Sequence, residues 1–110
     1  MDKRHTSSDE AHRLYLKGRF HQDLLVEQGL RKAVQYYQEA VAIDPTYALA
    51  YARLAEAHGL LADWGYDAPR SVYPAADTAA RKAIELDGSL AEGHAMLGKV
   101  LFYYLSLIHI

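Results

Sequence analysis

Histidine side chains are the groups in this chain best suited to chemistry, because an imidazole binds metals and exchanges protons near neutral pH. Their spacing argues against a metal site, since no two lie at the i, i+4 separation that places a pair of ligands on one helix face. There is no cysteine, which excludes thiolate ligands, cysteine nucleophiles and disulfides. We therefore expect no metal site. The histidines are His5, His12, His21, His58, His94 and His109.

Motifs for nucleophilic catalysis and phosphate binding are also missing. The chain has no G-x-S-x-G elbow and no glycine-rich phosphate loop. Serine, histidine and aspartate occur in almost any chain of this length, so their presence alone does not predict a catalytic triad. We expect this segment not to be an enzyme and to carry no cofactor.

Composition indicates one globular domain. The chain has 110 residues, of which 51% are hydrophobic and 24% charged, and its formal net charge is −2. That charge predicts no binding of nucleic acid. No apolar run approaches the roughly 18 residues of a membrane span, and Met1–Ser8 has no signal-peptide core. We expect a soluble cytoplasmic chain without membrane insertion, or a periplasmic one if a parent protein carries an upstream membrane span.

Two blocks of sequence recur at one spacing. Residues 48–57 (ALAYARLAEA) return at 91–100 (AEGHAMLGKV), and residues 40–45 (AVAIDP) return at 83–88 (AIELDG), both 43 residues later. A shared spacing for two separate blocks indicates a copied helix–turn–helix unit. Such a unit cannot bury its apolar face alone, so copies stack on one another.

Periodicity and capping residues predict an all-α chain with five helices. Residues 1–8 are predicted to be a linker, and we expect helices at 9–22, 27–43, 47–62, 70–87 and 90–104. Ser8, Thr46 and Ser89 are the expected capping residues at three of the starts, and Asp44-Pro45 is expected to end the second helix. Pro74 predicts a kink or a split in the fourth helix.

The repeated residues resemble the tetratricopeptide repeat (TPR), in which small side chains lie where two antiparallel helices cross. The units here are longer than the usual 34 residues, at 37 (from Ala11) and 43 (from Ala48). The resemblance implies an antiparallel helix–turn–helix TPR solenoid over residues 9–104, with two repeats and one further helix. The matching residues are Ala33, Tyr37, Ala40 and Pro45, then Ala76, Ala80 and Ala83, and in the first helices Gly18, Leu54-Ala55 and Leu97-Gly98.

Residues 11–19 and 44–52 are also similar to a bacterial TPR subgroup found in class III cyclases, winged-helix regulators and Ser/Thr kinases. This resemblance implies a fragment of a larger signalling or regulatory protein that acts as a protein–protein interaction scaffold. Two alternatives remain open. The chain is the C-terminal part of an adenylate/guanylate cyclase or kinase, or it is the sensing domain of a transcription regulator.

The resemblance also implies a binding groove on the concave face, formed by the first helix of each unit. Its expected ligand is a protein or peptide, with self-association as the other use of the surface and solvated helix faces without a partner as the alternative. The chain has no asparagine, so the carboxylate clamp of chaperone-binding TPR domains is not formed. The implied groove residues are His12, Tyr15, Arg19, Leu49, Ala52, Glu56, Glu92, Ala95, Lys99 and Phe102.

Two further segments carry separate expectations. Trp64 and Tyr66 lie in a long loop rich in glycine and aspartate, where they either contact a partner or fold back over the helices. Residues 105–110 (LSLIHI) resemble the translation of an adapter used to prepare sequencing libraries. We interpret them as a non-native tail.

Overall fold

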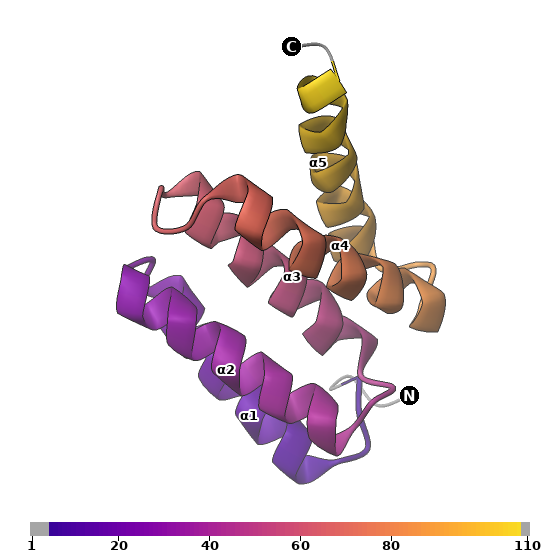
Figure 1. Ribbon diagram of the computed structural model, residues 1–110. Helices are drawn as coiled ribbons and strands as arrows, with labels where there is room; N and C mark the ends of the chain where they lie inside the picture. Colours follow the sequence, from indigo (N-terminus) through magenta and orange to yellow (C-terminus); the bar gives the residue numbers. More distant parts are fainter. Residues whose placement is uncertain (1–4, 109–110) are drawn as a thin grey trace.

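The computed structural model describes residues 5–108 and consists of five α-helices (Figure 1). No strand occurs within these residues, which confirms the predicted all-α class. Four of the predicted helices agree with the structure to within one residue at each end. The fifth is longer than expected, because it continues to Ile108. The helices are α1 (Asp9–Asp23), α2 (Glu27–Ile43), α3 (Ala48–Asp63), α4 (Pro69–Leu86) and α5 (Ala91–Ile108).

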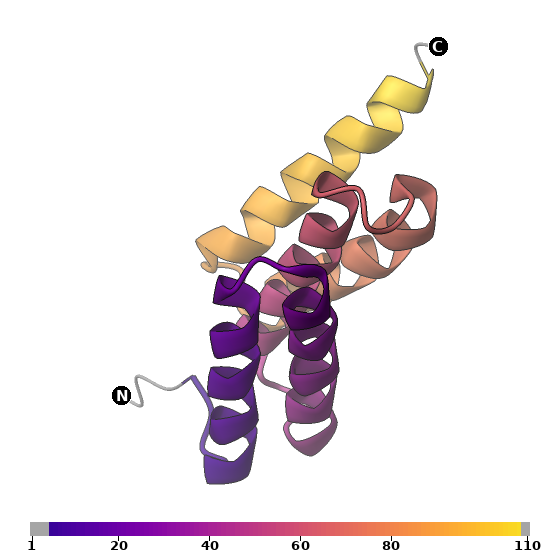
Figure 2. The ribbon, with the colours of Figure 1, turned by 90° about the vertical axis from the view of Figure 1, so that its left-hand side faces the viewer.

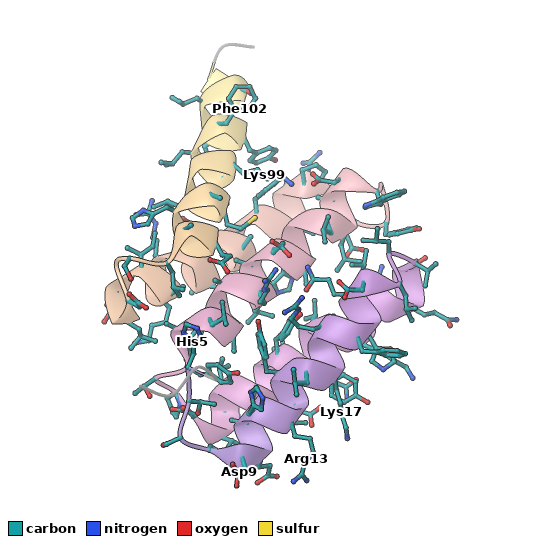
Figure 3. All side chains as sticks on the ribbon, turned by 180° about the vertical axis from the view of Figure 1, so that it is seen from behind. His5, Asp9, Arg13, Lys17, Lys99 and Phe102 are labelled. Carbon is teal, nitrogen blue, oxygen red and sulfur yellow. The ribbon has the colours of Figure 1, made fainter. Side chains whose placement is uncertain are left out.

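Consecutive helices pack as hairpins. Helix α1 packs against α2 and α3 against α4; α2 also contacts α3, and α5 contacts both α3 and α4. The result is an elongated body with principal extents of 46 × 30 × 18 Å. In Figures 1 and 2 the C-terminal half of α5 extends beyond the other helices. One face of the molecule, shown in Figure 3, is formed by the first helix of each sequence unit. These helices are α1, α3 and α5.

The core combines alanines with tyrosines. Tyr37 and Tyr47 are fully buried, and the Tyr15 ring lies between them, with centroid separations of 5.9 Å and 5.4 Å. Gly18 makes room for this cluster, because a Cβ atom there would lie 2.5 Å from the Tyr37 ring. Small residues at the helix crossings thus let the axes approach while the large rings fill the neighbouring space. The fully buried alanines of the second helices are Ala33, Ala40, Ala76, Ala80 and Ala83.

The turns that follow α2 and α4 use the same hydrogen bonds at the 43-residue spacing. In the first, Asp44 N–H donates to the Ala40 carbonyl and Tyr47 N–H to the Asp44 carbonyl. In the second, Asp87 donates to Ala83 and Leu90 to Asp87 in the same way. The copied sequence therefore folds into copied turns.

The same turns correct two predicted helix caps. Helix α3 begins at Ala48 and α5 at Ala91, so neither Thr46 nor Ser89 is a capping residue. The Thr46 hydroxyl instead donates to the Asp44 carboxylate at 2.7 Å, and Ser89 donates to Asp87 at 2.6 Å. These bonds hold the pKa of each aspartate below its ordinary value, since they stabilise the charged carboxylate.

Two other predictions about helix ends have different outcomes. Ser8 caps α1 as expected, and its hydroxyl accepts a hydrogen bond from Ala11 N–H at 3.1 Å. Of the kink or split expected at Pro74, a split does not occur, because α4 continues without a break from Pro69 to Leu86. Pro69 occupies the first turn, where a missing N–H costs nothing, and Pro74 lies only one turn further along.

The ends of the chain bear on the predicted linker and tail. Of the linker, residues 1–4 lie outside the described residues, and Thr6 is buried with its hydroxyl donating to Asp44. Residues 105–108 of the presumed tail continue α5, whereas 109–110 lie outside the described residues. On α5, Leu101, Phe102 and Leu105 are exposed by 45%, 73% and 55%. This helix therefore leaves an apolar surface uncovered.

Candidate functional site

A groove runs along the face formed by α1, α3 and α5, the face seen in Figure 3. Its volume is about 780 Å³, within the range of pockets that hold small ligands or peptide side chains. It collects residues from the last turns of α1 and α3 and from the first half of α5. The lining residues are Gln22, Asp23, Leu25, Glu56, Leu60, Ala91, Glu92, Ala95, Met96 and Lys99.

The floor of the groove is apolar. Met96 packs close to α3, where a Cβ atom on Gly59 would lie 3.0 Å from the Met96 methyl group. Leu60 and Ala95 continue this surface, and Leu25 reaches it from the loop after α1. Leu25 has a positive φ of 54°, a backbone conformation that residues other than glycine rarely adopt. The backbone at this rim is therefore strained, and Leu25 remains 43% exposed.

One wall is a chain of polar contacts that joins four helices. The Tyr37 hydroxyl donates to Gln22 Oε1 at 2.6 Å, and Gln22 Nε2 donates to the Glu56 carboxylate. Arg53 Nη1 donates to Glu56 Oε1 at 3.2 Å, and Arg53 Nη2 lies 3.8 Å from Glu92 Oε2. Burial raises the pKa of Tyr37, so its hydroxyl stays protonated and remains a donor. The contacts fix the side chains of Gln22 and Glu56 at the groove.

The opposite end of the groove carries a second ion pair. Lys99 on α5 donates to the Asp63 carboxylate at the end of α3, and Figure 3 shows the lysine directed toward that helix. Both side chains remain more than a third exposed, so water weakens their attraction. Within residues 5–108, Lys99 is nevertheless the only cation that lines the groove, and it is already paired with Asp63.

The structure brings together part of the predicted set. Glu56, Glu92, Ala95 and Lys99 line the groove as the resemblance implied. His12, Arg19 and Phe102 do not line it: His12 stacks on Tyr15 with ring centroids 6.4 Å apart, Arg19 is exposed on α1, and Phe102 lies further along α5.

Three of the predicted groove residues belong to the core instead. Tyr15 is 4% exposed, Leu49 is 9% exposed and Ala52 is fully buried. In α1 and α3 these positions face the neighbouring helices, where the tyrosine cluster and the helix crossing need them. Tyr15 is therefore a core residue and does not line the groove, where the resemblance placed it.

The residues missed by sequence reasoning lie at the ends of α1 and α3, in the loop after α1 and in the first half of α5. The repeat position that selects Phe102 in the third unit selects Gln22 in the first unit, so one signal was present. Asp23, Leu25, Leu60 and Met96 had no comparable signal, because their approach depends on how the helices cross.

The loop aromatics lie outside this groove. Trp64 is 54% exposed and Tyr66 is half-buried. Their loop is fastened to α2, since Arg31 contacts both Asp67 carboxylate oxygens, at 2.9 Å and 3.2 Å. The Arg31 hydrogen bonds lower the pKa of Asp67. Trp64 therefore remains a surface residue on a tethered loop.

Within the described residues, no group of three or more histidine, aspartate or glutamate side chains could hold a metal ion. No helix in this part of the chain is sufficiently long and apolar to cross a bilayer. Comparisons with protein-family models, with curated proteins and with solved structures find no match to this chain.

Proposed function

We propose that the chain is a TPR-like antiparallel helical repeat that acts as a protein–protein interaction scaffold. It binds a peptide segment of a partner in the groove between α1, α3 and α5. The observation that carries this proposal is the groove itself, an open channel of about 780 Å³ with an apolar floor and polar walls. Apolar floors with a few fixed polar groups are typical of peptide-binding surfaces.

The repeated architecture rests on two observations from the fold. The turns after α2 and α4 share their hydrogen bonds at a 43-residue spacing. Small buried residues, such as Ala33 and Ala76, occupy equivalent places in the two second helices. Copying of both sequence and turn favours stacked helix pairs, whose extended faces are commonly used for binding.

The sequence resemblance further supports a place for this scaffold within a larger bacterial signalling protein. The parent would be a cyclase, a kinase or a transcription regulator. Self-association is a second candidate function, favoured by the exposed apolar residues Leu101 and Phe102 on α5.

Peptide binding in the groove can be tested by a substitution that fills the groove with a larger side chain. Ala95 is exposed and lines the groove, so Ala95→Arg places a long side chain in it without disturbing the core. Ala42 is an exposed alanine of α2 outside the groove, and Ala42→Arg is the matched control. Short peptides selected from a random displayed library against the original chain should bind Ala95→Arg about tenfold or more weakly and Ala42→Arg unchanged. Equal binding to both variants would contradict the groove assignment.

A further inference from the structure

The groove differs from the rest of the molecule in its charge. Three of its lining residues are carboxylates, Asp23, Glu56 and Glu92, and Lys99 is its one cation. Arg53 contacts Glu56 and Glu92, and Asp63 neutralises Lys99. Four carboxylates thus face two cations, an excess of two negative charges, and the whole chain has a formal net charge of −2. The groove and the side chains paired with its lining therefore carry a local excess of negative charge.

Helix orientation contributes partial charges of both signs, because α5 begins at the groove, at Ala91 and Glu92, and its N-terminus carries a partial positive charge. Helices α1 and α3 end at the groove, at Asp23 and Asp63, and the C-terminus of a helix carries a partial negative charge. Lys99 compensates Asp63, but no cation of residues 5–108 contacts the Asp23 side chain. Glu92 lies in the first turn of α5, where a carboxylate is favourable. The uncompensated charge is therefore greatest near Asp23.

The repeat shows how this asymmetry arises. Lys99 and Glu56 occupy the same place in copies that are 43 residues apart. Between α3 and α5, Lys99 therefore compensates the charge of Asp63. Between α1 and α3, the equivalent position on α3 holds Glu56, which adds a negative charge instead. A cationic side chain supplied by a ligand would take the role near Asp23 that Lys99 has near Asp63.

We infer that the ligand of the groove is a basic peptide segment, in which one or more lysine or arginine residues flank apolar side chains. The apolar side chains pack on Leu60, Ala95 and Met96, and a cation lies at Asp23. This inference rests on the proposed function, since it names the chemistry of the partner. Acidic peptides are disfavoured, because they would meet unpaired carboxylates.

The test uses three peptides of one apolar sequence whose variable positions are all lysine, all glutamine or all glutamate. Titration calorimetry or fluorescence anisotropy with the full chain should rank them lysine, glutamine, glutamate in decreasing affinity. Added salt should narrow the differences, because it screens exposed charges. Asp23→Asn should weaken the lysine peptide by about two- to fivefold, as expected for one exposed ion pair, and leave the glutamine peptide unchanged.

A charge reversal makes the test specific. Asp23→Lys should shift the preference toward the glutamate peptide. Glu39→Lys makes the same change in net charge at an exposed site of α2 outside the groove and should leave the ranking intact. Equal affinity of all three peptides, each lost in Ala95→Arg, would overturn the basic-peptide inference and leave the groove standing. Binding unaffected by Ala95→Arg, or no binding of any peptide at millimolar concentration, would overturn both.

Discussion

Single small residues decide how closely the helices of this protein approach. Gly18, Ala55 and Gly98 occupy one repeat position, yet their surroundings differ. A Cβ atom at Gly18 would meet the Tyr37 ring at 2.5 Å, whereas one at Gly98 would have no neighbour within 4 Å. The same residue type is therefore required for packing in α1 and is only a weak helix former in α5.

This contrast predicts opposite effects for the same substitution. Gly18→Ala should destabilise the fold by about 1–3 kcal/mol, because the Tyr37 ring must move within a packed core. Gly98→Ala should stabilise it by about 0.5–1 kcal/mol, because alanine is the better helix former. Urea unfolding followed by circular dichroism measures both. Similar effects of the two variants would contradict the packing assigned to Gly18.

Tyr15 carries a second prediction at this scale. Its ring is buried against Tyr37 and Tyr47, so Tyr15→Ala should destabilise the fold by about 3–5 kcal/mol, as for other buried aromatic residues. Trp64→Ala, at an exposed loop site, should change stability by less than about 0.5 kcal/mol. If Tyr15→Ala has the same urea midpoint of unfolding as the original chain, the ring is not part of the core.

At the scale of elements, the seam between α2, α3 and α4 contains a titratable group. His58 on α3 faces Arg31 and Asp67 across a small pocket of about 270 Å³. Burial lowers the pKa of His58 from its ordinary value of 6.5, and the charge of Asp67 only partly opposes this effect. The folded state therefore binds a proton at His58 less readily than the unfolded state does.

Stability should consequently fall as the medium is acidified. The contribution of His58 is complete above pH 6.5 and is lost as the pH falls from that value toward the lowered pKa. His58→Gln should remove part of the pH dependence of the free energy of unfolding between about pH 7 and pH 5. His94→Gln, at an exposed site of α5, should retain it. A pH dependence unchanged by His58→Gln would exclude this source.

The elements also show which features were predictable from sequence. Helix positions follow from local periodicity, so the helix at 27–43 was correct. Ala33, Tyr37 and Ala40, which the resemblance singled out, are fully buried. The predicted caps at Thr46 and Ser89 were wrong, because each helix begins two residues later. Each hydroxyl instead donates to the aspartate two residues before it, within the turn. The groove was only partly anticipated, since its lining depends on how α1, α3 and α5 cross, which no local pattern encodes.

At the scale of the whole molecule, α5 is the exposed edge. Phe102 is 73% exposed, and Leu101 and Leu105 lie nearby on the same helix. Apolar patches of this kind promote association. Sedimentation velocity should show concentration-dependent self-association that Phe102→Gln reduces. Phe20→Gln, at an exposed site of α1 (64%), is the matched control and should not reduce it. A chain that stays monomeric at all concentrations would contradict this prediction.

The matching turns after α2 and α4 have a genetic consequence. Because both turns use the same backbone hydrogen bonds, the chain enters the next helix in the same way after Tyr47 and after Leu90. Loss of residues 48–90, or insertion of a second copy of them, would join existing ends without requiring a new turn. Recombination within such a gene can therefore change the number of helix pairs, and with it the length of the proposed binding face, while every junction remains one that already folds.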